Sequence, residues 1–162
     1  MRSIFKLFPI AILAVIMLMA FAKPTETTNV KCLIQMVNYS GEGAYVVISL
    51  MNPEGEYEET LYVQGKDKEW YSDITEWWKF YGKRRPDIDA ISGETIAGGE
   101  RTVSVIKIPN DKIDAGYSIR FETAVEDQEY YADDVQFELT SENVKAKIDG
   151  KGFIRYIRMI PQ

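Results

Sequence analysis

The sequence contains no histidine and a single cysteine among its 162 residues. The absence of histidine excludes Ser-His-Asp and Cys-His catalysis, together with zinc, copper and haem sites that use histidine ligands. The single cysteine, Cys32, cannot form an internal disulfide. Any metal site would therefore need oxygen ligands alone. We predict no catalytic residue and no metal ligand, and we expect that the protein is not an enzyme.

Long apolar stretches are also scarce, and the one that exists lies at the N-terminus. Two basic residues precede an apolar run over residues 7–21, and the tripeptide AFA at residues 20–22 has the small side chains that signal peptidase accepts. We therefore predict a cleaved signal peptide over residues 1–22, followed by a linker over residues 23–30. The run is shorter than the roughly 20 residues that span a bilayer. We expect a periplasmic protein with no transmembrane segment after cleavage.

Basic residues are outnumbered by acidic ones. Of the 19 basic residues, 17 follow residue 22, as do all 25 acidic residues, so the mature chain would carry a net charge of −8. A surface of this charge repels phosphate groups, which disfavours nucleic acids and anionic membranes as partners.

Acidic residues are densest between residues 126 and 134. The segment contains Glu126, Asp127, Glu129, Asp133 and Asp134. Their oxygen atoms would suit Ca²⁺, but the segment lacks the ordered spacing of a calcium-binding loop. We interpret this acidic loop as solvated negative surface.

Short segments rich in β-branched and aromatic residues make up most of the chain, and glycine, proline, asparagine or aspartate separates them. This spacing predicts an antiparallel β-sandwich in a single domain over residues 31–162. The predicted strands cover residues 31–39, 44–51, 58–64, 101–108, 117–125, 134–139, 143–149 and 152–159. The alternating sequence NVKAKI, followed by the turn DGKG, predicts that the last two strands form a hairpin.

One segment has the periodicity of a helix instead. In SDITEWWKFYG the apolar side chains fall at positions i, i+3, i+4 and i+7, which are Ile74, Trp77, Trp78 and Tyr81. Asp73 and Glu76 have the spacing of a capping box at the start of this helix. Aromatic side chains at helical spacing usually join the core, here as a plug at one end of the sandwich. Alternatively, Trp77, Trp78 and Tyr81 form part of an exposed platform, with Trp70 and Phe80, on which a planar ligand stacks.

The order of these features resembles that of a known family. The sequence AGYSI at residues 115–119, followed by Glu122 and Ala124, resembles the strand entry of the Ig-like domain in flagellar hook-capping proteins. The whole arrangement, from Lys31 to Leu139, is similar to the predicted periplasmic family called domain of unknown function 2271. The resemblance implies an Ig-like antiparallel β-sandwich with one short aromatic helix.

The resemblance also implies a role. Members of that family are thought to be encoded beside PepSY-type membrane proteins, flavin transferases and iron-uptake receptors of the outer membrane. It therefore implies a periplasmic accessory or binding protein of a membrane-linked redox or iron-assimilation system, with membrane redox or PepSY-type proteins as partners. It supplies no catalytic residue. A structural or adhesive sandwich module without a small ligand is a further alternative.

The stretch DAISGET resembles a second pattern, Asp-x-x-(Ser/Thr)-Gly-Ala-(Ser/Thr), which periplasmic flavin transferases modify. Asp89, Ser92, Gly93 and Thr95 match it, and Thr95 would carry FMN through the FMN phosphate. Glu94 departs from the pattern and places a carboxylate beside that phosphate. An ordinary exposed turn also needs these residue types. We therefore expect a turn and no cofactor, with covalent FMN as the alternative.

Overall fold

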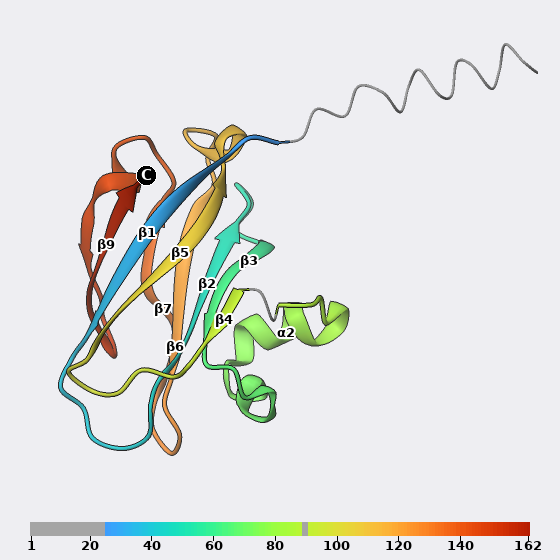
Figure 1. Cartoon of the computed structure of the whole chain (residues 1–162). Coiled ribbons are helices and arrows are strands. Elements are labelled where there is room, and N and C mark those ends of the chain that lie inside the picture. The colour runs from blue at the N-terminus through green and yellow to red at the C-terminus, as the bar shows by residue number, and fades with distance from the viewer. Residues whose placement is uncertain (1–24, 89–90) are drawn as a thin grey trace, which may run out of the picture.

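Two β-sheets pack face to face, and a short α-helix lies outside them (Figure 1). The computed structural model describes residues 25–88 and 91–162, so the predicted signal peptide and Asp89 lie outside the described residues. The prediction of a mainly β sandwich with one short aromatic helix is confirmed for the described part of the chain. The finer Ig-like relation stays a prediction.

The first sheet is antiparallel and has the strand order β5-β1-β9-β8. Its strands are β5 (Arg101–Pro109), β1 (Thr27–Met36), β9 (Ile154–Pro161) and β8 (Lys147–Asp149). Every second side chain of β1, from Val30 to Met36, is fully buried against the other sheet. The side chains between them face outward, because successive residues of a strand point to opposite faces.

The second sheet has the order β4-β3-β2-β6-β7, with parallel pairing between β3 and β4 alone. Its strands are β4 (Ser92–Gly93), β3 (Tyr57–Gln64), β2 (Tyr45–Met51), β6 (Ser118–Ala124) and β7 (Tyr130–Glu138). The central strand β2 is buried on both faces after its first residue. This explains why its sequence, YVVISLM, is a nearly continuous apolar run without alternation.

Apolar side chains form two separate clusters. The larger cluster lies between the sheets and includes Cys32, Ile48, Phe121 and Ile157. Cys32 is a free thiol, and burial raises its pKa to about 12, which makes it an uncharged core residue. The smaller cluster joins outward-facing residues of β2, β3 and β6 to the aromatic segment.

The aromatic segment covers the outer face of the five-stranded sheet. It consists of the 3₁₀-helix η2 (Lys68–Asp73) and the α-helix α2 (Thr75–Arg84). Trp77 and Tyr81 pack there with Val47 of β2 and Val63 of β3. The predicted plug at one end of the sandwich is therefore wrong in position. The outward faces of β2 and β3 are apolar, and an apolar sheet face must be covered by another element.

Most predicted strands agree with the observed strands to within a few residues, and two differences are larger. β1 begins at Thr27 and pairs there with Pro109, so residues 27–30 belong to the sheet and not to a linker. The predicted strand over residues 143–149 is mostly the short 3₁₀-helix η5 (Asn143–Lys145), and β8 retains three residues of it. The Thr140 hydroxyl accepts the Asn143 amide there, which favours a turn. A further 3₁₀-helix, η4 (Asn110–Lys112), follows β5.

Candidate functional site

A cavity of about 140 Å³ lies where β2 begins and β6 ends, beside the start of the aromatic segment. Both protein loops and regular elements contribute to its wall. The lining residues are Glu42, Gly43, Tyr45, Trp70, Asp73, Thr95, Ala124, Val125 and Glu126. We call it the acidic cavity.

Negative charge dominates the acidic cavity. Three carboxylates, those of Glu42, Asp73 and Glu126, line it, and no lysine or arginine is among its described lining residues. The pKa of Tyr45 rises to about 12, first because burial disfavours the phenolate and then because Asp67, Asp73 and Glu126 repel it. The same negative potential that opposes a phenolate favours a bound cation.

Two aromatic side chains share the wall with these carboxylates. Trp70, on η2, is 37% exposed. Tyr45, the first residue of β2, meets the buried Tyr71 edge to face at 6.2 Å and donates its hydroxyl to the Asp67 carbonyl at 3.3 Å. The faces of such rings attract cations. The sequence pattern indicated Trp70 as part of a platform but contained no sign that Tyr45 and the carboxylates lie beside it.

Thr95, the proposed FMN acceptor, lies on the wall of this cavity and is exposed. Gly43 approaches it so closely that a Cβ there would lie 2.5 Å from Thr95 Oγ1. Ser92 and Gly93 of the same pattern form β4 and pair with Val63 and Gln64, so two of the seven residues of DAISGET form a short strand and not an open turn. The fourth matching residue, Asp89, lies outside the described residues.

The charges around Thr95 differ from those that the sequence predicts. Glu94, expected to oppose a phosphate, forms an exposed ion pair with Lys66. The basic side chains of Arg84 and Arg85 lie over the rings of Phe80 and Trp78, at 5.0 and 5.7 Å from the ring centroids. The carboxylates of the cavity wall are therefore the main charges that an FMN phosphate would meet at Thr95.

Trp77 and Tyr81 do not form an exposed platform, because Trp77 is fully buried and Tyr81 is 6% exposed. Their rings stack on each other with centroids 4.5 Å apart, and Trp77 Nε1 donates to Thr60 Oγ1 at 2.9 Å. Trp78 is half-buried on the same helix. The stacking alternative therefore does not hold for Trp77 and Tyr81, and the core alternative describes them.

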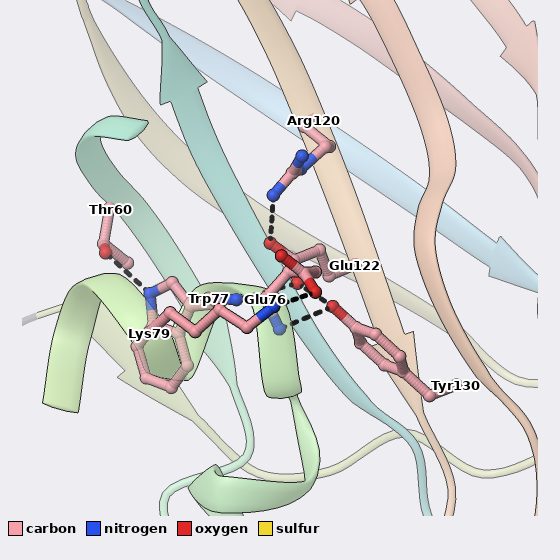
Figure 2. A network of polar contacts seen from close by, with 7 residues as sticks. All are labelled: Thr60, Glu76, Trp77, Lys79, Arg120, Glu122 and Tyr130. Carbon is pink, nitrogen blue, oxygen red and sulfur yellow. Dashed lines mark hydrogen bonds and ion pairs between the residues drawn. The ribbon is translucent and has the colours of Figure 1, made fainter. Parts of the chain in front are cut away.

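A buried carboxylate of the sheet holds the beginning of α2 (Figure 2). Glu122 of β6 is fully buried, and its Oε2 accepts the Trp77 backbone amide at 3.1 Å and the Tyr130 hydroxyl. Tyr130 Oη in turn accepts the backbone amide of Glu76 at 3.0 Å. The first amides of an α-helix have no partner within the helix, so Glu122 and Tyr130 supply partners that the helix itself lacks.

This arrangement replaces the predicted capping box. The N-cap residue is Ile74, and no side-chain cap forms there. The predicted pair, Asp73 and Glu76, has other roles: Asp73 lines the cavity, and Glu76 pairs with Lys79 on the helix surface. A local sequence pattern could not identify Glu122 as the cap, because Glu122 lies more than forty residues away along the chain.

Arg120 is the remaining charged member of the network. Its guanidinium lies 3.1 Å from Glu122 Oε1 (Figure 2). Burial raises the pKa of Glu122 to about 8, a net value that already includes the opposing effect of the hydrogen bonds from Tyr130 and Trp77. Burial likewise lowers the pKa of Arg120. The polar contact between the two groups is therefore made at a desolvation cost to both.

The sequence model of one family, described as "Predicted periplasmic protein (DUF2271)", matches residues 27–156. The chain belongs to this family. The predicted family and the predicted periplasmic location are therefore confirmed. No curated protein and no solved structure matches the chain. No helix in the described residues is long and apolar enough to cross a membrane.

The acidic loop of this DUF2271 protein separates into different roles. Glu126 lines the cavity, whereas Asp133 pairs with Lys151. Asp134 is fully buried and accepts three backbone amides, those of residues 151, 152 and 154, and the Thr123 hydroxyl. Asp134 therefore fixes the turn before β9 and is not solvated surface as predicted. No group of three acidic or cysteine side chains in the described residues lies close enough to hold one metal ion.

A second, larger cavity of about 560 Å³ lies between β3, β5 and the end of α2. Its wall includes Phe80, Arg84, Val105 and Lys107. It also includes Ile88 and Ile91, which flank residues 89–90, outside the described part of the chain. Its charges are mixed, so it favours no single class of ligand.

The raised pKa of Glu122 predicts a pH-dependent contribution to stability. The folded state holds the Glu122 proton more tightly than the unfolded chain does, so this contribution is complete below about pH 4.5 and is lost as the pH rises through about 8. Glu122→Gln cannot titrate. The free energy of unfolding of the wild type, minus that of Glu122→Gln, should fall between pH 5 and pH 8, with a slope of up to about 1.4 kcal/mol per pH unit.

Urea unfolding of both proteins at several pH values measures this difference. The other titrating groups are common to both proteins and cancel. Parallel stability curves would contradict the shift and would mean that Glu122 stays ionised, beside Arg120, over the whole range.

Proposed function

We propose that this periplasmic DUF2271 protein is a non-catalytic binding protein that holds a small organic cation in the acidic cavity. The observation that carries the proposal is the composition of the wall, in which the carboxylates of Glu42, Asp73 and Glu126 accompany the rings of Tyr45 and Trp70. Carboxylates and aromatic faces attract the same ligand, because both present negative potential to it.

The arrangement of the carboxylates favours an organic cation over a metal ion. A bare metal ion needs several oxygen ligands within about 2.0–2.6 Å, and no three acidic side chains of the described chain meet closely enough for that. An alkylammonium group spreads its charge over a larger volume and can contact carboxylates that lie apart. The cavity is smaller than the roughly 300 Å³ at which drug-sized ligand sites begin, so it suits a single ammonium group.

The non-catalytic part of the proposal rests on the position of the reactive groups. The carboxyl group with the raised pKa, Glu122, is fully buried beneath α2 and is not part of the cavity wall. A general acid or base must reach the substrate. The sequence contains no histidine, so the cavity cannot contain a nucleophile that is activated by a histidine base.

A role in a membrane-linked redox or iron-assimilation system stays part of the proposal, with membrane redox or PepSY-type proteins as partners. This part rests on the genes beside which members of the DUF2271 family are thought to be encoded. A cation-binding accessory protein is compatible with such a system, and the ligand would then be an amine-bearing compound or the amine of a partner's side chain.

Choline, a quaternary ammonium compound, should bind, and its neutral isostere with carbon in place of nitrogen should not. Trp70→Leu should weaken choline binding about tenfold, because a cation–π contact is lost. Phe80→Leu removes an aromatic ring that lies outside the acidic cavity and should leave the affinity unchanged. Isothermal titration with both compounds measures this.

Two charge variants of the acidic loop provide a matched comparison in the same titration. Glu126→Gln removes a carboxylate of the cavity wall, whereas Glu129→Gln removes one that does not line it. Weaker binding is expected for the first variant alone. Equal affinity of the wild type for choline and for the neutral isostere would rule out a cation site in this cavity.

Covalent FMN on Thr95 is the second candidate, and one observation favours it. Thr95 is exposed and shares the cavity with Trp70, so a flavin attached there would have an aromatic neighbour. The carboxylates of the wall oppose it, because each repels a phosphate by about 1 kcal/mol at 4 Å in water-like surroundings. The flavin would supply the electron transfer, and the protein would set its exposure.

Co-expression with a periplasmic flavin transferase tests this candidate. If Thr95 is the acceptor, the intact mass of the exported protein increases by one FMN unit less water. Thr95→Ser keeps an acceptor hydroxyl and should retain the increase, whereas Thr95→Ala should lose it. An unchanged mass of the wild type, in cells that fully modify a control substrate, would eliminate FMN attachment.

A structural or adhesive module remains a third alternative. It is favoured by the edge strand β5, which pairs with β1 on one side and carries two exposed valines, Val103 and Val105. Unpaired edges and exposed apolar side chains are typical of surfaces that meet other molecules.

A further inference from the structure

The outer face of the four-stranded sheet gathers positive charge. Directly paired residues of neighbouring strands point to the same side of a sheet. Lys31 of β1 therefore shares the outer face with Val105 and Ile160, its partners in β5 and β9. The same register places five exposed cationic side chains on this surface, which we call the basic face: Lys31, Arg101, Lys107, Lys147 and Arg158.

The basic face differs in sign from the rest of the molecule. It holds five of the 17 basic residues that follow residue 22 and one of the 25 acidic residues, Asp149. The face therefore carries a net charge of +4, whereas the remainder of the mature chain carries −12. The net charge of −8 is therefore the sum of a positively charged basic face and a negatively charged remainder.

Carboxylates do not neutralise most of these cations. Arg101 donates to Gln35 at 3.0 Å and to the Tyr156 hydroxyl at 3.2 Å, which orients it without cancelling its charge. Lys147 lies 4.3 Å from the Tyr156 ring centroid and 3.8 Å from Asp149. In the described part of the chain, Lys31, Lys107 and Arg158 form no ion pair.

Aliphatic side chains stand among the cations. Val103 is 55% exposed, Val105 is 49% exposed and Ile160 is 42% exposed. Val105 and Ile160 flank Lys31 on the two sides of β1, and Val103 is in register with Leu33 and Arg158. Cations and protruding hydrocarbon therefore alternate over β1, β5 and β9. Acidic side chains lie at two margins of the face: Asp149 on β8, and Glu58, Glu59 and Asp87 in the cavity that they share with Val105 and Lys107.

The composition of the basic face favours one kind of binding partner over the others. A second copy of the same face would oppose five cations with five cations. Protein interfaces are depleted in lysine and gather several aromatic residues at their centres, whereas this face has three lysines and combines Tyr156 with aliphatic side chains. An anionic bilayer surface supplies phosphate groups for the cations and hydrocarbon for the valines and isoleucine.

We propose that the basic face docks this protein onto an anionic phospholipid bilayer, with its cations at the phosphate level and Val103, Val105 and Ile160 at the boundary with the acyl chains. This inference does not depend on a ligand in the acidic cavity. The net negative charge of the other faces orients the molecule, since those faces are repelled by the same membrane. The helix α2 lies on the far side of the molecule from β9 (Figure 1), and its end approaches the basic face at the cavity that Phe80 and Arg84 share with Val105 and Lys107.

Flotation of the exported protein with phosphatidylglycerol–phosphatidylcholine vesicles tests the proposal. The protein should float with these vesicles at low salt, remain free with phosphatidylcholine alone, and dissociate in high salt, because Debye screening shortens the attraction. Each surface cation contributes about fivefold to partitioning. The double variant Lys31→Glu, Lys107→Glu changes the charge of the face by four units and should therefore bind on the order of 600-fold more weakly.

The matched control is Lys79→Glu, Lys83→Glu, which changes the net charge equally on α2. It should bind like the wild type. Its thermal midpoint should fall slightly, because Lys79 pairs with Glu76, and both variants should stay folded at the temperature of the assay. At intermediate salt, contacts between hydrocarbon side chains and the bilayer should account for more of the remaining binding. The double variant Val103→Ser, Val105→Ser should weaken this remaining binding. Absence of flotation with the wild type, an equal loss in the α2 control, or binding to heparin without binding to vesicles would overturn the proposal.

Discussion

The buried Glu122 carboxylate is the contact on which the functional end of the molecule depends. It is the sheet's acceptor for the first turn of α2, where the backbone amides have no partner within the helix. Each of these hydrogen bonds contributes about 0.5–1.5 kcal/mol net. Because η2 leads directly into α2, fixing the helix also fixes Trp70 and Asp73 on the cavity wall.

The sandwich gives the protein two outer surfaces of different character. The outer face of the five-stranded sheet is apolar at β2 and β3 and is covered by the aromatic segment, with the acidic cavity at its margin. The outer face of the four-stranded sheet is uncovered and basic. Both surfaces follow from the same alternation of side chains, and they differ in whether the outward residues are apolar or charged. The proposed cation site and the proposed docking surface therefore belong to different sheets.

Periodicity within short segments predicted much of this structure. The alternation in β1 and β5, and the helical spacing of Trp77 and Tyr81, identified these elements and the layered fold. Periodicity could not predict contacts between residues that are distant along the chain. The cap from Glu122, the amides gathered by Asp134 and the pairing of Lys31 with Val105 each join residues that are distant along the chain. The net charge pointed away from anionic membranes because a sum over the chain contains no information about position.

The candidate site illustrates the same limit. Trp70 and Thr95 were each noted from the sequence, but their meeting in one cavity with Glu42 and Glu126 depends on three loops that the fold brings together. Conversely, the helical spacing of Trp77 and Tyr81 favoured the core and left an exposed platform as the alternative. The outward apolar residues of β2 and β3 decided between the two, because they require cover.

Hydrogen exchange of the Trp77 backbone amide tests most directly whether the sheet holds the helix through Glu122. This amide lies in the first helical turn, where amides usually exchange rapidly because they lack a helical partner. The Glu122 contact predicts exchange as slow as that of the interior amides of β6. Exchange at the rate of an unprotected first-turn amide would contradict the account, because Glu122 would then not hold the first turn of α2.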